Sequence, residues 1–187
     1  MLYISKGVVL KPSDIENVCV SRCGCEYMLH DMQAKLWLAG RFGLAKSEFS
    51  SELGELKNLE TMGLVETDDD CGDAVPFRLL NNCVICRANK NVFSLFLTKH
   101  ERGVWEWICN TGYKLTISEL VFLADRGIKP SSSYYGKANW QTLVNAIYTP
   151  ETIFDGILIA RMEKSPRRND IVAAVFGLIH KKLLILV

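Results

Sequence analysis

The stretch Ser47–Val65, SEFSSELGELKNLETMGLV, decides the fold of the first half of the chain. Its apolar residues recur at steps of three and four, the spacing of one face of an α-helix; they are Phe49, Leu53, Leu56, Leu59 and Met62. Gly63 follows as a helix stop, because glycine enters the left-handed conformation without a steric penalty. The sequence therefore predicts a helix capped by Ser47 that passes through Gly63 into a strand at Leu64-Val65-Glu66.

The residues on either side of this stretch predict another helix and further strands. Apolar residues spaced from Met32 to Gly40 indicate an amphipathic helix that ends near Gly43. After the acidic turn Asp68–Asp73, the apolar run Phe77–Ile85 is strand-like. Residues 1–29 are expected to form short strands, joined by a turn at Lys11–Asp14 and a tight turn at Cys23-Gly24-Cys25.

Helix, helix, Gly-Leu-Val, strand, polar turn and strand is an order that resembles the winged helix-turn-helix superfamily. The pattern Leu56-x-x-Leu59-x-x-x-Gly63-Leu64-Val65 looks like the end of that fold's third helix running into its wing. The resemblance covers about residues 28–90 and identifies no particular family within the superfamily. It implies a fold, whereas function has to be argued from the residues themselves.

The same order is repeated in the second half, because Leu29 and Trp37 can be laid on Leu97 and Trp105 at a constant offset. Thr116 and Glu119 have the spacing of a capping box. We expect helices over 97–110, 117–125, 139–147, 151–164 and 169–181, and a terminal strand over Leu183–Val187. The predicted class is mainly α with small β wings (α+β).

This pattern predicts two winged-helix-like units. The first spans residues 1–90, where short N-terminal strands precede the helices, and the second spans residues 91–187. The boundary is expected near Lys90-Asn91.

Composition is that of a packed globular protein, with 49% hydrophobic and 23% charged residues. The first residues, MLYISKGVVLK, lack the apolar core of a signal peptide. The longest apolar runs, Ile171–Ile179 and Leu183–Val187, are shorter than a membrane span. We therefore expect a cytoplasmic protein, and the apolar C-terminal runs are either the core of the second unit or a homodimer contact.

Seven cysteines raise the question of a metal site. Five of them could in principle supply thiolate ligands for zinc: Cys19, Cys23, Cys25, Cys83 and Cys86. Their spacings depart from the usual zinc patterns, and free cysteines usually behave as small buried hydrophobic residues. We favour that second interpretation and expect no metal and no cofactor.

No catalytic motif is present in the sequence. The three histidines, His30, His100 and His180, form neither an HxxxH nor an HExxH arrangement. There is also no Gly-x-Ser-x-Gly sequence and no phosphate-binding glycine loop. We therefore expect a protein that is not an enzyme.

Charge differs between two segments of the chain. Residues 46–70 hold two basic and eight acidic residues, whereas residues 126–187 hold nine basic and four acidic ones. A polyanion would therefore be attracted to the C-terminal half. The residues expected to contact nucleic acid there are Tyr134, Tyr135, Lys137, Asn139, Gln141, Lys164, Arg167 and Arg168.

Two functions are consistent with these features, and at this stage we favour the first. The first is a winged-helix transcriptional regulator that binds double-stranded DNA through its second unit, with base contacts from residues 134–141 and phosphate contacts from Arg167 and Arg168. The second is an adaptor that binds a protein or peptide without DNA. It resembles the small winged-helix peptide-recognition elements of peptide-modification pathways, which bind an extended partner by adding a strand to an exposed edge.

Overall fold

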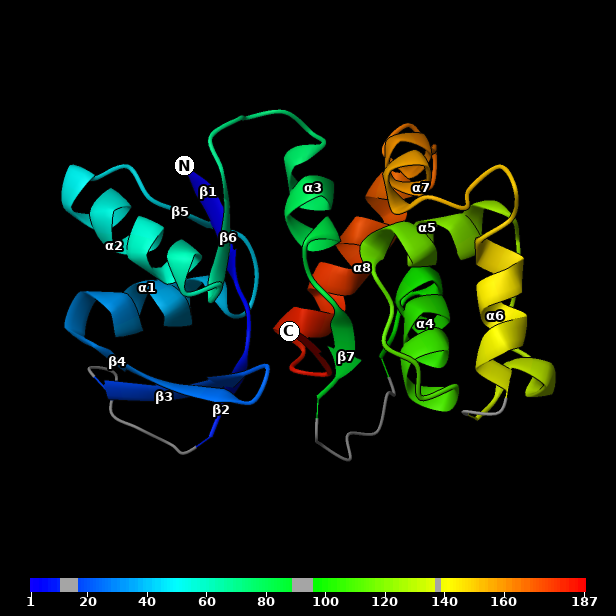
Figure 1. Cartoon of the computed structure of the whole chain (residues 1–187), viewed down its shortest axis with the longest axis horizontal. Coiled ribbons are helices and arrows are strands. Elements are labelled where there is room, and N and C mark those ends of the chain that lie inside the picture. Colours follow the sequence, from blue (N-terminus) through cyan, green and yellow to red (C-terminus); the bar gives the residue numbers. More distant parts are fainter. Residues whose placement is uncertain (11–16, 89–95, 137–138) are drawn as a thin grey trace. The chain divides into compact units, whose positions relative to one another are not determined.

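The computed structural model describes residues 1–10, 17–88, 96–136 and 139–187 (Figure 1). Two compact units are present, the first made of Met1–Cys83 with Ile185–Val187 and the second of Val84–Leu184. The predicted boundary at Lys90-Asn91 lies outside the described residues. The chain is mixed α and β, in agreement with the predicted α+β class.

Nine elements make up the first unit in the described residues. In chain order they are β1 (Leu2–Ser5), β2 (Val8–Val9), β3 (Asn17–Arg22), β4 (Cys25–His30), α1 (Asp31–Gly40), β5 (Ala45–Lys46), α2 (Ser50–Thr61), β6 (Val65–Asp68) and α3 (Val75–Asn81). Two antiparallel sheets result, with strand orders β5-β1-β6 and β2-β3-β4. The predicted N-terminal strands are confirmed, and the predicted Lys11–Asp14 turn lies outside the described residues.

Helix α1 provides the centre of this unit's core. It packs on β3 and β4 and on α2, and Figure 1 shows it lying between α2 and the β2-β3-β4 sheet. Trp37 of α1 is fully buried, and its indole Nε1 donates a hydrogen bond to the carbonyl of Lys6 at 3.0 Å. Leu56 and Leu59 of α2 are fully buried in the same core, so the centre of the predicted helical stripe is confirmed. Its two end residues, Phe49 and Met62, lie at the caps of the helix and are exposed, so that part of the prediction was wrong.

Ser47 is not the N-cap of α2, so that prediction was wrong. The helix begins at Ser50 with Phe49 in the cap position and no side-chain cap. Ser47 is buried and donates its hydroxyl hydrogen bond to Glu52 at 2.7 Å. A serine hydroxyl close to a helix start has several acceptors within reach, and here a carboxylate in the first turn is used.

The predicted strand over Phe77–Ile85 was also wrong, because most of it is helix α3. Pro76 occupies the first turn of that helix, where a proline without an N–H is tolerated. Val75 and Leu79 lie one helical turn apart and are both buried, so a helix directs them to the same side and into the core. The described part of the first unit therefore lacks the second strand of the expected wing.

The second unit is helical. Its elements are β7 (Ile85–Arg87), α4 (Lys99–Trp105), the π-helical turn η1 (Glu106–Asn110), α5 (Ile117–Asp125), the 3₁₀ turn η2 (Ser132–Tyr134), α6 (Trp140–Ile147), α7 (Asp155–Met162) and α8 (Arg168–His180). Strand β8 (Leu184–Leu186) begins at the last residue of the second unit and continues into the C-terminal residues of the first. The predicted helices and terminal strand are confirmed in position, although α7 is shorter than expected and the π turn was not foreseen.

Helix α5 is the core of the second unit. Every residue from Ile117 to Leu123 is buried, and α6, α7 and α8 all pack against it. The predicted capping box is confirmed, because Glu119 N donates to Thr116 Oγ1 at 3.3 Å and Thr116 N donates to the Glu119 carboxylate at 2.7 Å. No helix in the described residues is long and apolar enough to cross a membrane.

Shortening a buried side chain of α2 is expected to destabilise the protein much more than shortening an exposed one. Leu59→Ala should lower the free energy of unfolding by about 2–5 kcal/mol, because Leu59 is fully buried. Met62→Ala, at a side chain that is 39% exposed, should cost less than about 1 kcal/mol. Urea unfolding followed by circular dichroism measures both, and equal losses would contradict this packing.

Candidate functional site

The candidate site is the free edge of strand β4. Strand β4 spans Cys25–His30, is an outer strand of the β2-β3-β4 sheet, and pairs only with β3 within the described residues. We call the unpaired side of this strand the β4 edge. An unpaired strand side presents a row of backbone N–H and C=O groups that another chain can bind.

The hairpin turn determines which backbone groups point away from the sheet. Cys23 and Gly24 form a two-residue loop with φ angles of 52° and 83°, as in a type I′ turn. The flanking pair Arg22 and Cys25 is then a hydrogen-bonded pair, and pairing alternates from there along the strands. The backbone N–H and C=O groups of Cys25, Tyr27 and Leu29 therefore point to β3.

Glu26 and Met28 therefore direct both their N–H and their C=O groups to the open side. An independent hydrogen bond supports this register, because the carbonyl of Cys19, the partner of Met28, accepts from Leu10 N on the opposite side of β3 at 3.1 Å. His30 presents only its N–H, since its carbonyl lies at the N-cap of α1. The β4 edge thus offers alternating donors and acceptors at the spacing of an extended chain.

Side chains along β4 alternate between core and solvent. Leu29 is 1% exposed and packs in the core, whereas Met28 is 56% exposed. His30 and Asn17 are joined by a side-chain hydrogen bond of 2.7 Å between Nδ1 and Oδ1. A shift of one residue would bring Leu29 to the surface, so burial of this side chain holds the register of the edge.

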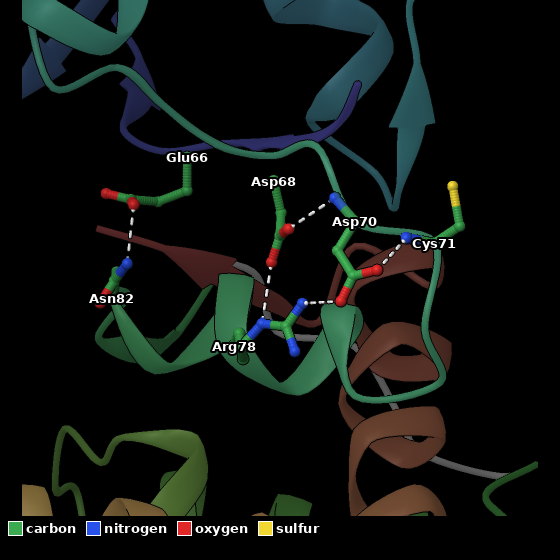
Figure 2. A network of polar contacts seen from close by, with 6 residues as sticks. All are labelled: Glu66, Asp68, Asp70, Cys71, Arg78 and Asn82. Carbon is green, nitrogen blue, oxygen red and sulfur yellow. Dashed lines mark hydrogen bonds and ion pairs between the residues drawn. The ribbon is translucent and has the colours of Figure 1, made fainter.

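The other sheet edges of the first unit are short or covered. Strands β2 and β5 have two residues each. Strand β6 is covered by α3, whose Arg78 donates to Asp68 at 2.9 Å and to Asp70 at 2.8 Å, as Figure 2 shows. Asn82 of the same segment donates to Glu66 at 2.9 Å. Covering an edge with a helix is a common protection against strand addition, and among the described residues the open side of β4 has no strand partner.

The sequence of β4 also carries few of the devices that discourage pairing, and Glu26 is its one carboxylate side chain. It contains no proline and no lysine, and its one-to-one register with β3 has no bulge. Residues 1–83 contain eight lysines and arginines against thirteen aspartates and glutamates. An extended partner with basic residues is therefore favoured by charge over a second copy of this acidic unit.

The predicted nucleic-acid residues of the 134–141 segment are partly engaged in the second unit's own structure. Tyr134 stacks edge-on against Trp107 with ring centroids 5.5 Å apart. Asn139 Nδ2 donates to the carbonyl of Tyr135 at 2.8 Å, and Gln141 donates to Asn145 at 2.9 Å. Tyr135 and Gln141 are exposed, and Lys137 lies outside the described residues.

Lys164, Arg167 and Arg168 lie at the turn between α7 and α8. Lys164 and Arg167 are exposed, and Arg167 is 4.0 Å from Asp170. Arg168 is half-buried and donates its NH1 to the carbonyl of Glu163 at 2.8 Å. Part of this basic group is thus used to join the two helices.

The two predicted contact segments lie at opposite ends of α5. Trp140, at the start of α6, contacts Tyr113 ahead of α5 with ring centroids 5.0 Å apart. Ser165, in the α7–α8 turn, donates to Asp125 at the end of α5 at 2.9 Å. Figure 1 likewise places the start of α6 and the α7–α8 turn at opposite ends of this unit. The structure therefore does not gather the seven predicted residues that it describes into one compact site.

The cysteines do not form a metal cluster in the part of the chain that is described. Cys23 and Cys25 are exposed at the hairpin turn, whereas Cys83 and Cys86 are buried. Burial raises the pKa of the Cys83 thiol to about 12. A thiol with so high a pKa is protonated at neutral pH and is a poor nucleophile and metal ligand.

Comparison of the chain with protein-family models, with curated proteins and with solved structures finds no match. Function is therefore inferred from the geometry and charge of the chain itself.

The free β4 edge was not assigned to particular residues at the sequence level. The Cys23-Gly24-Cys25 turn indicated a hairpin, but strand pairing on the far side of β4 depends on residues distant in sequence. Backbone groups carry the site, and they are the same in every residue except proline. Gly24 in the turn was the signal that the sequence offered. Once the loop is known to have two residues, it determines which residues of β4 direct their backbone groups to β3 and which direct them outward.

The Arg78 network of Figure 2 is expected to make the docking of α3 acid-sensitive. Hydrogen bonds from the Arg78 guanidinium lower the pKa values of Asp68 and Asp70 below their ordinary values. Lowered carboxyl pKa values give a stabilisation that is complete above the ordinary pKa and is lost as the pH falls through the lowered one. After the intrinsic pH dependence of amide exchange is divided out, the protection of α3 amides should therefore fall selectively as the pH drops through the lowered carboxyl pKa values.

An Arg78→Met variant should lose much of this pH dependence, because the carboxylates then return toward their ordinary pKa values. Hydrogen exchange followed by mass spectrometry at several pH values measures it. Equal pH profiles for α3 in the two proteins would contradict the assigned role of Arg78.

Proposed function

We propose that this protein is a non-catalytic binding adaptor whose first unit binds an extended segment of a partner polypeptide along the β4 edge. The observation that supports it most directly is the open edge of β4, while β6 is covered by α3 and β2 and β5 have two residues each. Backbone hydrogen bonds would provide affinity, and exposed side chains such as Glu26 would provide selectivity. The acidic balance of the unit favours a basic segment.

We thus propose the second of the two functions expected from the sequence, an adaptor similar to the winged-helix peptide-recognition elements. Strands that precede helices, and the passage from α2 through Gly63 into β6, are the features that support it. The missing second wing strand does not weaken it, because β4 lies in the N-terminal sheet.

Replacing Met28 with proline is expected to abolish strand addition without unfolding the unit. The Met28 N–H points away from β3, so its removal breaks no bond within the sheet, and proline is tolerated at such positions. The probe is a set of 12-residue peptides selected from a random displayed library against the intact chain. Met28→Pro should weaken their binding at least about tenfold in a fluorescence titration.

The matched control is Met28→Ala, which keeps the N–H and removes only the exposed side chain. It should retain most of the affinity, and circular dichroism should show both variants folded. Equal binding by the folded Met28→Pro variant and the natural chain would contradict addition at β4.

DNA binding by the second unit is a second candidate, because residues 84–187 contain fourteen lysines and arginines against eight aspartates and glutamates. A winged-helix regulator, acting as a homodimer, would place that charge against phosphates. Arg167 is exposed and Lys164 lies beside it in the α7–α8 turn, which supports a phosphate contact there.

Under this second candidate, replacing Arg167 and Arg168 together with alanine should weaken binding to a 30-base-pair duplex by about tenfold. The dependence of affinity on salt should also become shallower. Replacing Lys46 and Lys57 of the acidic unit is the control and should change little. Absence of duplex binding at low salt, measured by electrophoretic mobility, would remove this candidate and leave the adaptor.

A further inference from the structure

The second unit contains a cavity that the proposed function does not use. It has a volume of about 360 Å³ and is lined by residues of α4, η1, α5, the loop after α5 and α8. Cavities of roughly 300–1,000 Å³ are the size that small organic ligands occupy in proteins. All of its lining residues belong to the second unit.

The floor of the cavity is apolar and well packed. Val104, Trp107 and Leu120 contribute to it, and each is 5% exposed or less. Ile171 of α8 adds a fourth side chain that is 6% exposed. This floor would take the hydrocarbon or ring portion of a ligand, since burying such surface is favourable.

The rim of the cavity is mostly basic. Lys99, Arg102 and Lys129 line it and are exposed, and the described residues offer none of them an ion pair. Glu106 is the one acidic residue of the lining. His100 also lines it and is 3.9 Å from Asp170. Unpaired basic groups above an apolar floor match a ligand with an anionic head and an apolar body.

A local distortion of the helix forms one wall. After Trp105 the helix changes from α to π over Glu106–Asn110, and its first two residues, Glu106 and Trp107, line the cavity. The hydroxyl of Thr111 donates to the carbonyl of Trp107 and helps to close this turn. π-helical turns are rare and occur often at functional sites, where they redirect side chains.

From these observations we propose that this cavity binds a small organic acid with one carboxylate and an apolar chain or ring system. The carboxylate lies at the rim near Arg102 and Lys129, and the apolar body lies against Trp107, Leu120 and Ile171. A single negative charge fits best, because a more highly charged ligand would also face Glu106.

Gly103 offers a way to block the cavity without disturbing the fold. It lies in α4, lines the cavity, and a β-carbon placed on it meets no atom within 4 Å. Leucine favours the helix more than glycine does, so Gly103→Leu should fold at least as well and should fill the space. Gly156→Leu, in α7 of the same unit and away from the cavity, is the matched control.

The probes are octanoate and 2-naphthoate, each compared with a neutral analogue, 1-octanol or 2-naphthol, by calorimetry with the full chain. At least one acid should bind on the order of tenfold more tightly than its neutral analogue. Gly103→Leu should weaken that binding at least about tenfold, and Gly156→Leu should leave it unchanged. Arg102→Gln combined with Lys129→Gln should remove the preference for the acid.

Melting curves check that each variant is folded. If Gly103→Leu does not fold, the variant with both Arg102→Gln and Lys129→Gln provides the test. Failure of both acids to bind at millimolar concentration would overturn the proposal. It would also be overturned by equal binding of acid and neutral analogue, or by unchanged binding to a folded Gly103→Leu variant. None of these results bears on the β4 edge, because the cavity lies in the other unit.

Discussion

Burial of Leu29 is the constraint on which the first unit depends. Its side chain enters the core beside Val18, Val20 and Trp37, and this fixes the face that β4 turns inward. The two-residue turn at Cys23-Gly24 then sets which backbone groups bond to β3. Glu26 and Met28 are left pointing outward as a consequence. The candidate site thus follows from packing and turn geometry, although no special side chain marks it.

Local signals in the sequence predicted much of the helical structure. The apolar stripe of α2 and the Thr116–Glu119 capping box depend on residues within one or two turns, so neighbouring residues suffice to recognise them. Gly63 adopts φ 71° at the end of α2, in keeping with its predicted role as a helix stop.

Where prediction failed, tertiary packing decided between local alternatives. Phe77–Ile85 has enough apolar residues for a strand, but α3 buries Phe77, Leu79 and Leu80 while its Arg78 reaches Asp68. That contact spans the predicted acidic turn Asp68–Asp73, and the return of Arg78 onto its aspartates is not evident from sequence. Because α3 forms a helix where a second wing strand was expected, β6 is covered by a helix.

The second unit differs from the first in its basic net charge and in the cavity between its helices. The chain's net charge of +1 combines an acidic first unit with a basic second one. Some of the second unit's basic residues join helices, as Arg168 does, and others surround the cavity beside the π-helical turn. A count of charges in the sequence could not separate these uses, because it does not show which residues face one another.

Among the described residues the outward backbone groups of β4 have no strand partner, and we propose that they become bonded when a peptide adds. Residue-resolved amide hydrogen exchange tests it most directly. We expect fast exchange at Glu26 and Met28 and slow exchange at Tyr27 and Leu29 in the free protein. Glu26 and Met28 should become protected once a selected peptide is bound. Protection of Glu26 and Met28 in the free monomer, or no change there on binding, would contradict it.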